Sequence, residues 1–237
     1  MPNKEELIAL YRFKTELHAH ALPISRCSEF VPEALAKVYG KVGVDTLVLT
    51  NHFTPSQVDE RSKEELTEAY WNCYEDVAQA AEKEGFRAIF AMEIRFRQNS
   101  NDYLLYGITK EDLPFLYDAV KDGMDIDEFY RAFHSDRVLI FQAHPYRNGC
   151  EPAKSESIDG IEVFNMHPGH NSRPAIAARM ANEAGLIATG GTDFHHPGHE
   201  ACCLLRSKTK PTDSHSLAEL LRRRDYLLDI SGSIILP

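Results

Sequence analysis

The chain has 237 residues and a formal net charge of −10 at pH 7, and its composition is 43% hydrophobic and 26% charged. These values are typical of a globular protein with one substantial core, so they argue against a disordered chain. The acidic balance argues against a nucleic acid as the main partner, because such binding needs a broad basic surface.

Short apolar runs alternate with helical patterns along the chain. Runs of four to eight residues without strict polar alternation are typical of buried parallel strands. Capping residues and glycine stops mark the helices between them. This alternation predicts βαβ units in a β/α barrel that forms a single domain over residues 1–237. We expect strands at 13–20, 46–50, 88–94, 138–143, 161–165 and 186–189, and helices at 32–42, 62–84, 174–184, 217–224 and part of 113–134, interrupted at Gly123.

Residues that can bind a metal ion recur at the ends of the predicted strands. His18 and His20 close the first run, and their i, i+2 spacing directs both side chains to one face of a strand. Asp193 and His195 repeat this spacing after the last run. The carboxyl ends of barrel strands face one pocket, so we expect these side chains to converge there. The predicted metal ligands are His18, His20, His52, Glu93, His144, Asp193 and His195.

The predicted ligand set combines imidazoles with carboxylates and does not require a thiolate. Such a set suits Zn²⁺, Mn²⁺ or Fe²⁺, so we expect two or three divalent metal ions as cofactors. Two ions about 3.5–4 Å apart can share a water, lower its pKa to near neutrality and hold the oxygens of a phosphoryl group. With Glu93 or Asp193 as a bridging carboxylate, the pattern predicts a metal-dependent hydrolase that acts on a phosphate ester.

Three residues are candidates for catalysis. Asp193 and His195 are expected to act in catalysis as well as in metal binding, and His167 lies just past a strand end, where it is a candidate proton donor or further ligand. Isolated histidines in loops rich in Pro, Gly and Ser are more often surface residues. We therefore expect the surface for His170, His196, His199 and His215, with His196 and His199 close enough to His195 to support it or to contact substrate.

Candidates for substrate binding follow the same strand ends. Arg147, two residues after Pro145, is placed to make a bidentate contact with a phosphate group, and Arg26 has a similar but weaker case in the loop after His20. Arg147 is equally well explained as an exposed loop residue. Asn165 is placed to hydrogen-bond substrate or a metal ligand. Together these residues predict a small anionic phosphorylated substrate.

Several segments resemble the four-part signature of the PHP family (polymerase and histidinol phosphatase). They are Glu16-Leu17-His18-Ala19-His20, Thr50-Asn51-His52, Met92-Glu93, Ala143-His144-Pro145 and Thr192-Asp193-Phe194-His195, and residues 101–108 and 160–165 are also similar to stand-alone bacterial PHP metal-dependent phosphoesterases. The resemblance covers residues 13–205. It implies a distorted (β/α)7 TIM-like barrel, a centre of two or three metals and phosphoesterase activity. By matched motif, it implies as ligands His18, His20, His52, Glu93, His144, Asp193 and His195.

Two departures from the family's pattern keep other functions open. Asn51 stands where the family usually has Asp, and residues 21–27 contain none of the Asp, Glu or His that often follows the first motif. A degenerate, regulatory metal-binding PHP module without turnover is therefore one alternative. An amidohydrolase-type metal hydrolase is another, because such barrels also open with His-x-His, although they usually need more chain and we see no metal-bridging lysine at a strand end.

The cysteines and the absence of targeting signals predict a cytoplasmic location. The five cysteines show no CxxC spacing, which indicates reduced thiols rather than a disulfide framework or a zinc ribbon. Residues 1–11 lack an apolar signal segment, and no run of about 18 apolar residues occurs, so no membrane partner is expected. The sequence indicates no particular oligomeric state.

Overall fold

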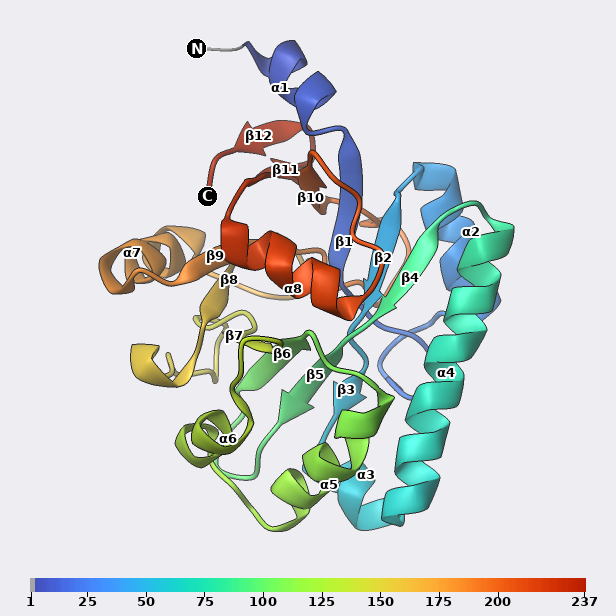
Figure 1. Cartoon of the computed structure of the whole chain (residues 1–237), viewed down its shortest axis with the longest axis vertical. Helices are drawn as coiled ribbons and strands as arrows, with labels where there is room; N and C mark the ends of the chain where they lie inside the picture. Colours follow the sequence, from blue (N-terminus) through green and yellow to red (C-terminus); the bar gives the residue numbers. More distant parts are fainter. Residues whose placement is uncertain (1–2) are drawn as a thin grey trace.

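The computed structural model describes residues 3–237 and shows a mixed α/β fold with two six-stranded sheets (Figure 1). The first sheet has the order β12 (Ser233–Ile235), β11 (Tyr226–Ile230), β10 (Cys203–Ser207), β1 (Phe13–Ala19), β2 (Thr46–Leu49) and β4 (Arg87–Phe90). The second has the order β3 (His52–Phe53), β5 (Met92–Arg95), β6 (Asp102–Tyr106), β7 (Leu139–Gln142), β8 (Gly160–Asn165) and β9 (Ile187–Gly191).

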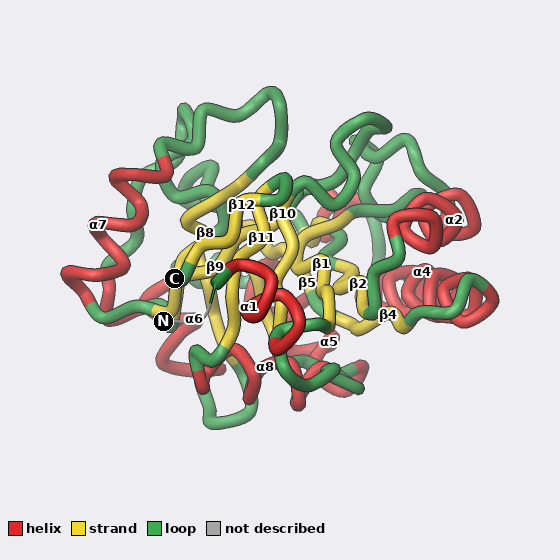
Figure 2. The backbone as a smooth tube through the Cα atoms, turned by 90° about the horizontal axis from the view of Figure 1, so that it is seen from above, coloured by secondary structure: helices red, strands yellow, loops and turns green. Residues whose placement is uncertain are grey.

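Helices surround the strands, which gather in the middle of the molecule (Figure 2). Helices α2 and α4 pack together on one side, and α7 lies on the opposite side. No helix within residues 3–237 combines the length and the apolar character needed to cross a membrane. The helices are α1 (Lys4–Leu10), α2 (Pro32–Val42), α3 (Pro55–Glu60), α4 (Lys63–Lys83), α5 (Leu113–Lys121), α6 (Ile126–Phe133), α7 (Pro174–Ala184) and α8 (Ser214–Arg223).

The predicted helices are present, with one boundary moved by its cap. Helices α2 and α7 have the expected bounds, and residues 113–134 contain two helices separated around Gly123. Helix α4 begins after Ser62, whose hydroxyl accepts a hydrogen bond from the Glu65 amide. The expected start of the last helix at residue 217 is wrong by three residues, because Asp213 accepts a bond from the Ser216 amide and starts α8 earlier.

The predicted strand at 88–94 is two strands that belong to different sheets. The break lies at Ala91, whose amide donates to the Leu49 carbonyl at 3.1 Å, and the Glu93 amide then donates to the Asn51 carbonyl at 3.0 Å. Strand β4 thus completes the first sheet, and β5 enters the second. The single strand expected from the apolar run is wrong because an unbroken run does not reveal such a change of sheet.

The expected parallel arrangement applies to only part of the sheets. Strand β6 pairs antiparallel with β5 and β7, and β10, β11 and β12 form an antiparallel extension beside β1. Near the end of β1, the Phe194 amide donates to the His18 carbonyl at 3.2 Å, and the His20 amide donates to the Phe194 carbonyl at 3.1 Å. Within residues 3–237 these contacts do not join the strands into one continuous ring, so a closed (β/α)7 barrel and the single-domain boundary stay predictions.

Helix α8 covers the end of the strands that lies away from the polar side chains. The Ser214 hydroxyl at its start accepts a hydrogen bond from the Gly107 amide at 2.9 Å, just past β6. The helix contributes apolar side chains to a buried cluster that also draws on strands of both sheets. This cluster includes Leu17, Val48, Ile89, Leu104, Phe141, Leu205, Leu217, Ala218 and Leu221.

Candidate metal centre

Strands of both sheets bring the predicted ligands to one place. His18 and His20 lie at the end of β1, fully buried, with ring centroids 5.0 Å apart. His52 in β3 and Glu93 in β5 are register partners on neighbouring parallel strands, so their side chains share a face. His144 follows β7 and is also buried. The sequence pattern thus identified residues that meet in space.

The Glu93 carboxylate lies at the middle of the group and reaches four imidazoles. Its Oε1 atom is 3.4 Å from His18 Nε2 and 3.2 Å from His144 Nε2. Its Oε2 atom is 3.5 Å from His20 Nε2 and 2.7 Å from His52 Nδ1. The two oxygens of Glu93 thus face two different pairs of imidazoles, and Glu93 would hold divalent cations together with these rings.

Asp193 forms a second carboxylate centre beside Glu93. Its Oδ1 atom is 3.5 Å from His18 Nε2, 3.3 Å from His20 Nε2 and 3.3 Å from His195 Nδ1. Asp193 and His144 both adopt a positive φ, 54° and 31°, a backbone conformation that side chains other than glycine rarely accept. Such strain is commonly found where a functional site fixes the backbone.

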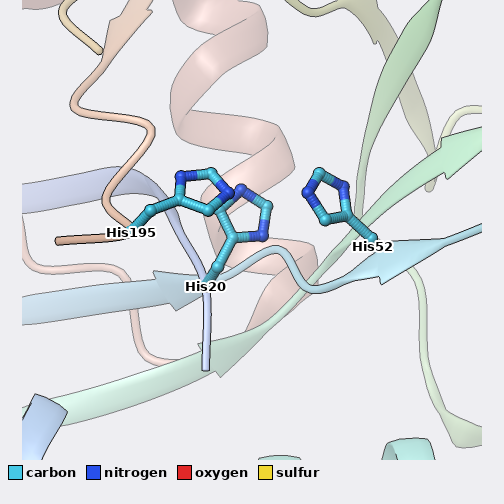
Figure 3. A group of neighbouring side chains, drawn as sticks. All are labelled: His20, His52 and His195. Carbon is cyan, nitrogen blue, oxygen red and sulfur yellow. The ribbon is translucent and has the colours of Figure 1, made fainter. Parts of the chain in front are cut away.

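The ligand atoms form three overlapping groups, each within 4.8 Å of one another. Figure 3 shows one of them, the imidazoles of His20, His52 and His195, which come from three separate segments of the chain. The three groups are His20, His52 and His195; His18, His20 and Asp193; and His52, Glu93 and Asp102.

Buried atoms without hydrogen bonds show that this donor set suits cations. The Nε2 atoms of His18 and His20, the Nδ1 atom of His52 and the Oε2 atom of Glu93 are buried without a hydrogen-bond partner of acceptable geometry. A buried polar atom left without a partner is costly, and most such atoms in proteins are satisfied. Here they face one another across short distances, as expected for donors to divalent metal ions.

Glu162 fixes two of the imidazole-bearing segments from outside the group. Its Oε1 atom accepts the hydrogen bond of His18 Nδ1 at 2.9 Å, which leaves Nε2 of that ring for a cation. Its Oε2 atom accepts from the His144 amide at 3.0 Å. Gly191 makes room for this contact, because a Cβ there would lie 2.5 Å from His18 Cβ and 2.7 Å from Glu162 Oε1.

Mutual electrostatics keep the carboxylates ionised despite complete burial. Burial opposes the charge of Glu93, but His52 and His18 hold its pKa well below the usual value. Burial likewise opposes the charge of Asp193, and the neighbouring imidazoles, His18 first, lower its pKa. Burial also lowers the pKa of His20 well below its usual value, and the nearby charge of His52 adds to this effect. Burial opposes the charge of His18 and His52 as well, but Glu162 and Glu93 raise the pKa of these two imidazoles well above the usual value, so carboxylate and imidazole charges balance within the group.

A cavity of about 220 Å³ opens onto these side chains. A larger cavity of about 710 Å³ lies against helix α7. Its described lining contains no histidine or cysteine. The smaller cavity is therefore the better candidate for a metal site. The smaller cavity is lined by Cys27, His52, Arg95, His144, Arg147, His167, His170, Asp193, His195 and His196.

The other predicted site residues lie at different distances from the centre. Arg147 lines the cavity, with Nη2 3.3 Å from Asp102 Oδ2. His167 also lines it, and burial lowers its pKa to about 4. Asn165 is turned toward the ligands, because its Nδ2 donates to Asp193 Oδ2 at 3.0 Å. Arg26 lies in an adjoining hollow, where its mostly exposed side chain pairs with Glu60 at 2.8 Å.

Four further residues of the centre were not predicted. Glu162 sits inside a strand rather than at its end, and Asp102 begins antiparallel β6, so the search for strand ends missed both. Arg95 pairs with Asp102 through two hydrogen bonds of 2.7 Å. His170 is not a surface residue as expected, because its Nδ1 lies 3.2 Å from Asp193 Oδ2. A charged residue within an apolar strand is a signal for Glu162, since such a group needs buried partners.

Comparison with known proteins shows a shared fold with solved structures. No family model and no curated protein matches this chain. A protein from Bifidobacterium adolescentis, provisionally named a metal-dependent phosphoesterase, is 14% identical over 88% of this chain and 96% of that one, with a TM-score of 0.51. PsfC from Pseudomonas syringae is 13% identical over 88% and 87%, with a TM-score of 0.58. A two-domain Bacteroides vulgatus protein containing a predicted PHP-like metal-dependent phosphoesterase is 17% identical over 94% and 66%, with a TM-score of 0.58.

Proposed function

We propose that this protein is a metal-dependent phosphoesterase that hydrolyses a small phosphate ester with metal-activated water on a PHP-type, distorted (β/α)7 barrel. The observation that carries the proposal is the convergence of buried, unpartnered imidazole and carboxylate atoms around Glu93 and Asp193. The motif resemblance and the names of two structures with the same fold support it. The residues that would hold two or three divalent cations are His18, His20, His52, Glu93, His144, Asp193 and His195.

The chain's own groups would hold the cations and keep their charge balanced. Bound divalent cations supply Lewis acidity and lower the pKa of water near a phosphoryl centre. Glu93 joins the imidazoles of both sheets through its two oxygens. Glu162 and Asn165 orient His18 and Asp193 from outside, so that the donor atoms are already in place before substrate arrives.

Two arginines give the cavity the charge that a phosphate group requires. Arg95 and Arg147 both line it and both bind Asp102, whose carboxylate positions their guanidinium groups side by side. A planar guanidinium binds phosphate oxygens in bidentate fashion. The cavity lining, as far as the structure describes it, contains no lysine. These features favour an anionic ester over the neutral cyclic amide of an amidohydrolase-type enzyme.

Asn51 does not weaken the proposal, although it stands where the resemblance implies an aspartate. Its Oδ1 atom accepts hydrogen bonds from the Ala21 amide at 2.7 Å and the Ser25 hydroxyl at 2.9 Å. Its Nδ2 atom donates to Cys73 Sγ at 3.3 Å. The residue therefore supports the loop after β1. The seven residues proposed as ligands are all present, which favours an active enzyme over a degenerate module.

Phosphate release by the metal-loaded protein tests the function. We expect hydrolysis of p-nitrophenyl phosphate with Mn²⁺, no hydrolysis after chelation, and no turnover of cyclic amides. Loss of metal and activity in the double variant His18→Ala/His20→Ala is expected beside an unaffected control, His215→Ala, whose ring is exposed and pairs with Glu219 on α8. Full metal loading without phosphate release from a broad panel of esters would contradict the proposal and favour a regulatory module.

A further inference from the structure

One histidine of the cavity contacts both the candidate metal centre and an arginine. His170 lines the cavity beside Arg147, and its side chain is only 17% exposed. Its Nδ1 atom lies 3.2 Å from Asp193 Oδ2, and its Nε2 atom lies 3.5 Å from Arg147 Nη1. The two nitrogens of one ring therefore face a candidate metal ligand and a candidate phosphate-binding group.

The neighbours of the His170 ring fix which nitrogen carries the proton. The amide nitrogen of Asn165 donates to Glu162 Oε2 at 2.9 Å and to Asp193 Oδ2 at 3.0 Å. Its amide oxygen is then the atom that lies 3.2 Å from His170 Nδ1. Nδ1 thus faces two acceptors, this oxygen and the Asp193 carboxylate, so it is the donor. A guanidinium can only donate, so Nε2 accepts from Arg147.

The loop after β8 holds the ring in this orientation. The His170 amide donates to the His167 carbonyl at 3.0 Å, and the two rings stack with centroids 4.1 Å apart and an interplanar angle of 25°. The Ser172 hydroxyl donates to the Asn165 carbonyl at 2.9 Å, which fixes the loop against the end of β8. Local contacts therefore set the direction of the ring before substrate arrives.

The segment that carries Arg147 is joined to the same loop. Arg173 donates to the Tyr146 carbonyl and, at 2.7 Å, to Asn148 Oδ1. Tyr146 and Asn148 are the chain neighbours of Arg147 on either side. The loops after β7 and β8 thus hold Arg147 and His170 at a fixed separation.

Both partners of His170 use their other atoms within the site. Asp193 directs Oδ1 to three imidazoles of the centre and uses Oδ2 for His170 and Asn165. Arg147 has Nη2 3.3 Å from Asp102 Oδ2 and Nη1 turned to His170. A hydrogen bond to one oxygen of a ligating carboxylate fixes the direction of the other oxygen. Removal of the ring is therefore expected to loosen both the carboxylate and the guanidinium.

We propose that His170 is a positioning residue that couples the candidate metal centre to the phosphate-binding arginine, with Nδ1 orienting Asp193 and Nε2 orienting Arg147. The inference rests on the proposed function, because it assigns the phosphate group of the substrate to Arg147. Metal affinity and phosphate affinity then depend on opposite edges of one ring. Substitutions that keep one edge at a time separate the two affinities.

Two substitutions of His170 each keep one edge. The Asn amide places a donor near the position of Nδ1, and the longer Gln places an acceptor near that of Nε2. In His170→Asn, we expect Mn²⁺ affinity within about twofold of wild type and phosphate affinity about tenfold weaker, because a hydrogen bond to a charged group is lost. In His170→Gln, we expect Mn²⁺ affinity about 10–100-fold weaker and phosphate affinity at saturating Mn²⁺ within about twofold of wild type.

Calorimetric titration measures both affinities without turnover. The full-length chain is titrated with Mn²⁺, and the Mn²⁺-saturated chain is titrated with inorganic phosphate. His215→Asn and His215→Gln are the matched controls, because this exposed ring on α8 pairs with Glu219, and both should keep wild-type affinities. Far-UV circular dichroism is expected to show an unchanged fold in all four variants, since His170 lies in a loop.

The outcomes separate this inference from the proposed function. Equal losses of both affinities in the two His170 variants, or wild-type affinities in both, overturn the coupling role of His170 and leave metal-dependent hydrolysis intact. A wild-type chain that binds Mn²⁺ and phosphate but hydrolyses no ester overturns the proposed function, and the two variants still decide the role of His170. A wild-type chain that binds no metal overturns both proposals together.

Discussion

The two ends of the strands differ sharply although the same strands supply both. At the carboxyl end of β1, the buried polar side chains are those of His18 and His20. One residue earlier, Leu17 faces the apolar cluster that α8 closes with Leu217. Alternation along a strand sends neighbouring residues to opposite environments. A single strand therefore contributes both to the candidate centre and to the core.

This contrast indicates how the fold separates stability from chemistry. The end covered by α8 is apolar and close-packed, which favours the folded state through burial. The opposite end buries polar atoms that have no hydrogen-bond partner in the protein, which costs free energy. The apolar end is thus expected to stabilise the arrangement at the polar end, and substitutions at the two ends should have separable effects.

The largest effect is expected from Asp193→Ala. The substitution removes a carboxylate that approaches His18, His20 and His195. We expect loss of bound metal and a decrease in kcat/KM of about 10³-fold, equivalent to about 4 kcal/mol, with the fold retained. Metal analysis and phosphate release measure it, with Asp225→Ala, an exposed partner of Lys208, as the control. Full activity of Asp193→Ala would remove this residue from the centre.

A substitution at the apolar end covered by α8 should lower stability and leave activity nearly unchanged. Leu217 on α8 is fully buried in the apolar cluster. Leu217→Ala is expected to lower the free energy of unfolding by about 2–5 kcal/mol, because it leaves a cavity. The kcat/KM of the folded fraction should stay within about twofold of wild type. Denaturant unfolding and kinetics at a temperature below the transition measure both, and a large loss of kcat/KM would show that the two ends are coupled.

The smallest effect is expected from Glu162→Gln. This substitution leaves the candidate ligands in place and changes only a residue that positions them. The amide that replaces one oxygen cannot accept from both His18 Nδ1 and the His144 amide. We expect metal binding to weaken by about 10–100-fold, with kcat at saturating metal much less affected. Metal titration measures this, beside Glu183→Gln on the exposed face of α7. Equal metal affinity in both variants would mean that Glu162 does not position these groups.

The sequence predicted the candidate ligands that follow the rule for parallel strands. His18, His20, Glu93 and His144 lie on or just after strands of that direction, so apolar runs followed by polar residues located them. Asp102 was not predicted because β6 is antiparallel to β5. Asp102 is the first residue of β6, and the start of this strand lies where the parallel strands end. Strand direction is set by pairing between distant segments, and an apolar run does not encode it.

One loop residue of the site was also placed wrongly from the sequence. His170 was expected at the surface because it lies among Gly, Asn and Ser, yet it contacts Asp193 and Asn165. Its place depends on how the segment after β8 folds back over the cavity, which no local pattern specifies. The helices were predicted well for the opposite reason, since their limits depend on nearby caps and glycines.

Because the candidate ligands come from both sheets, metal binding is expected to stabilise the folded protein. His18 and His20 come from the first sheet, and Glu93 and His144 are carried by β5 and the residue segment after β7 in the second. Ions bound among these residues would link the first sheet to the second. A ligand present at 100 times its dissociation constant stabilises the folded state by about 2.7 kcal/mol. With metal bound as proposed, removal of the metal is therefore expected to lower the stability of the folded protein as well as to stop the proposed hydrolysis.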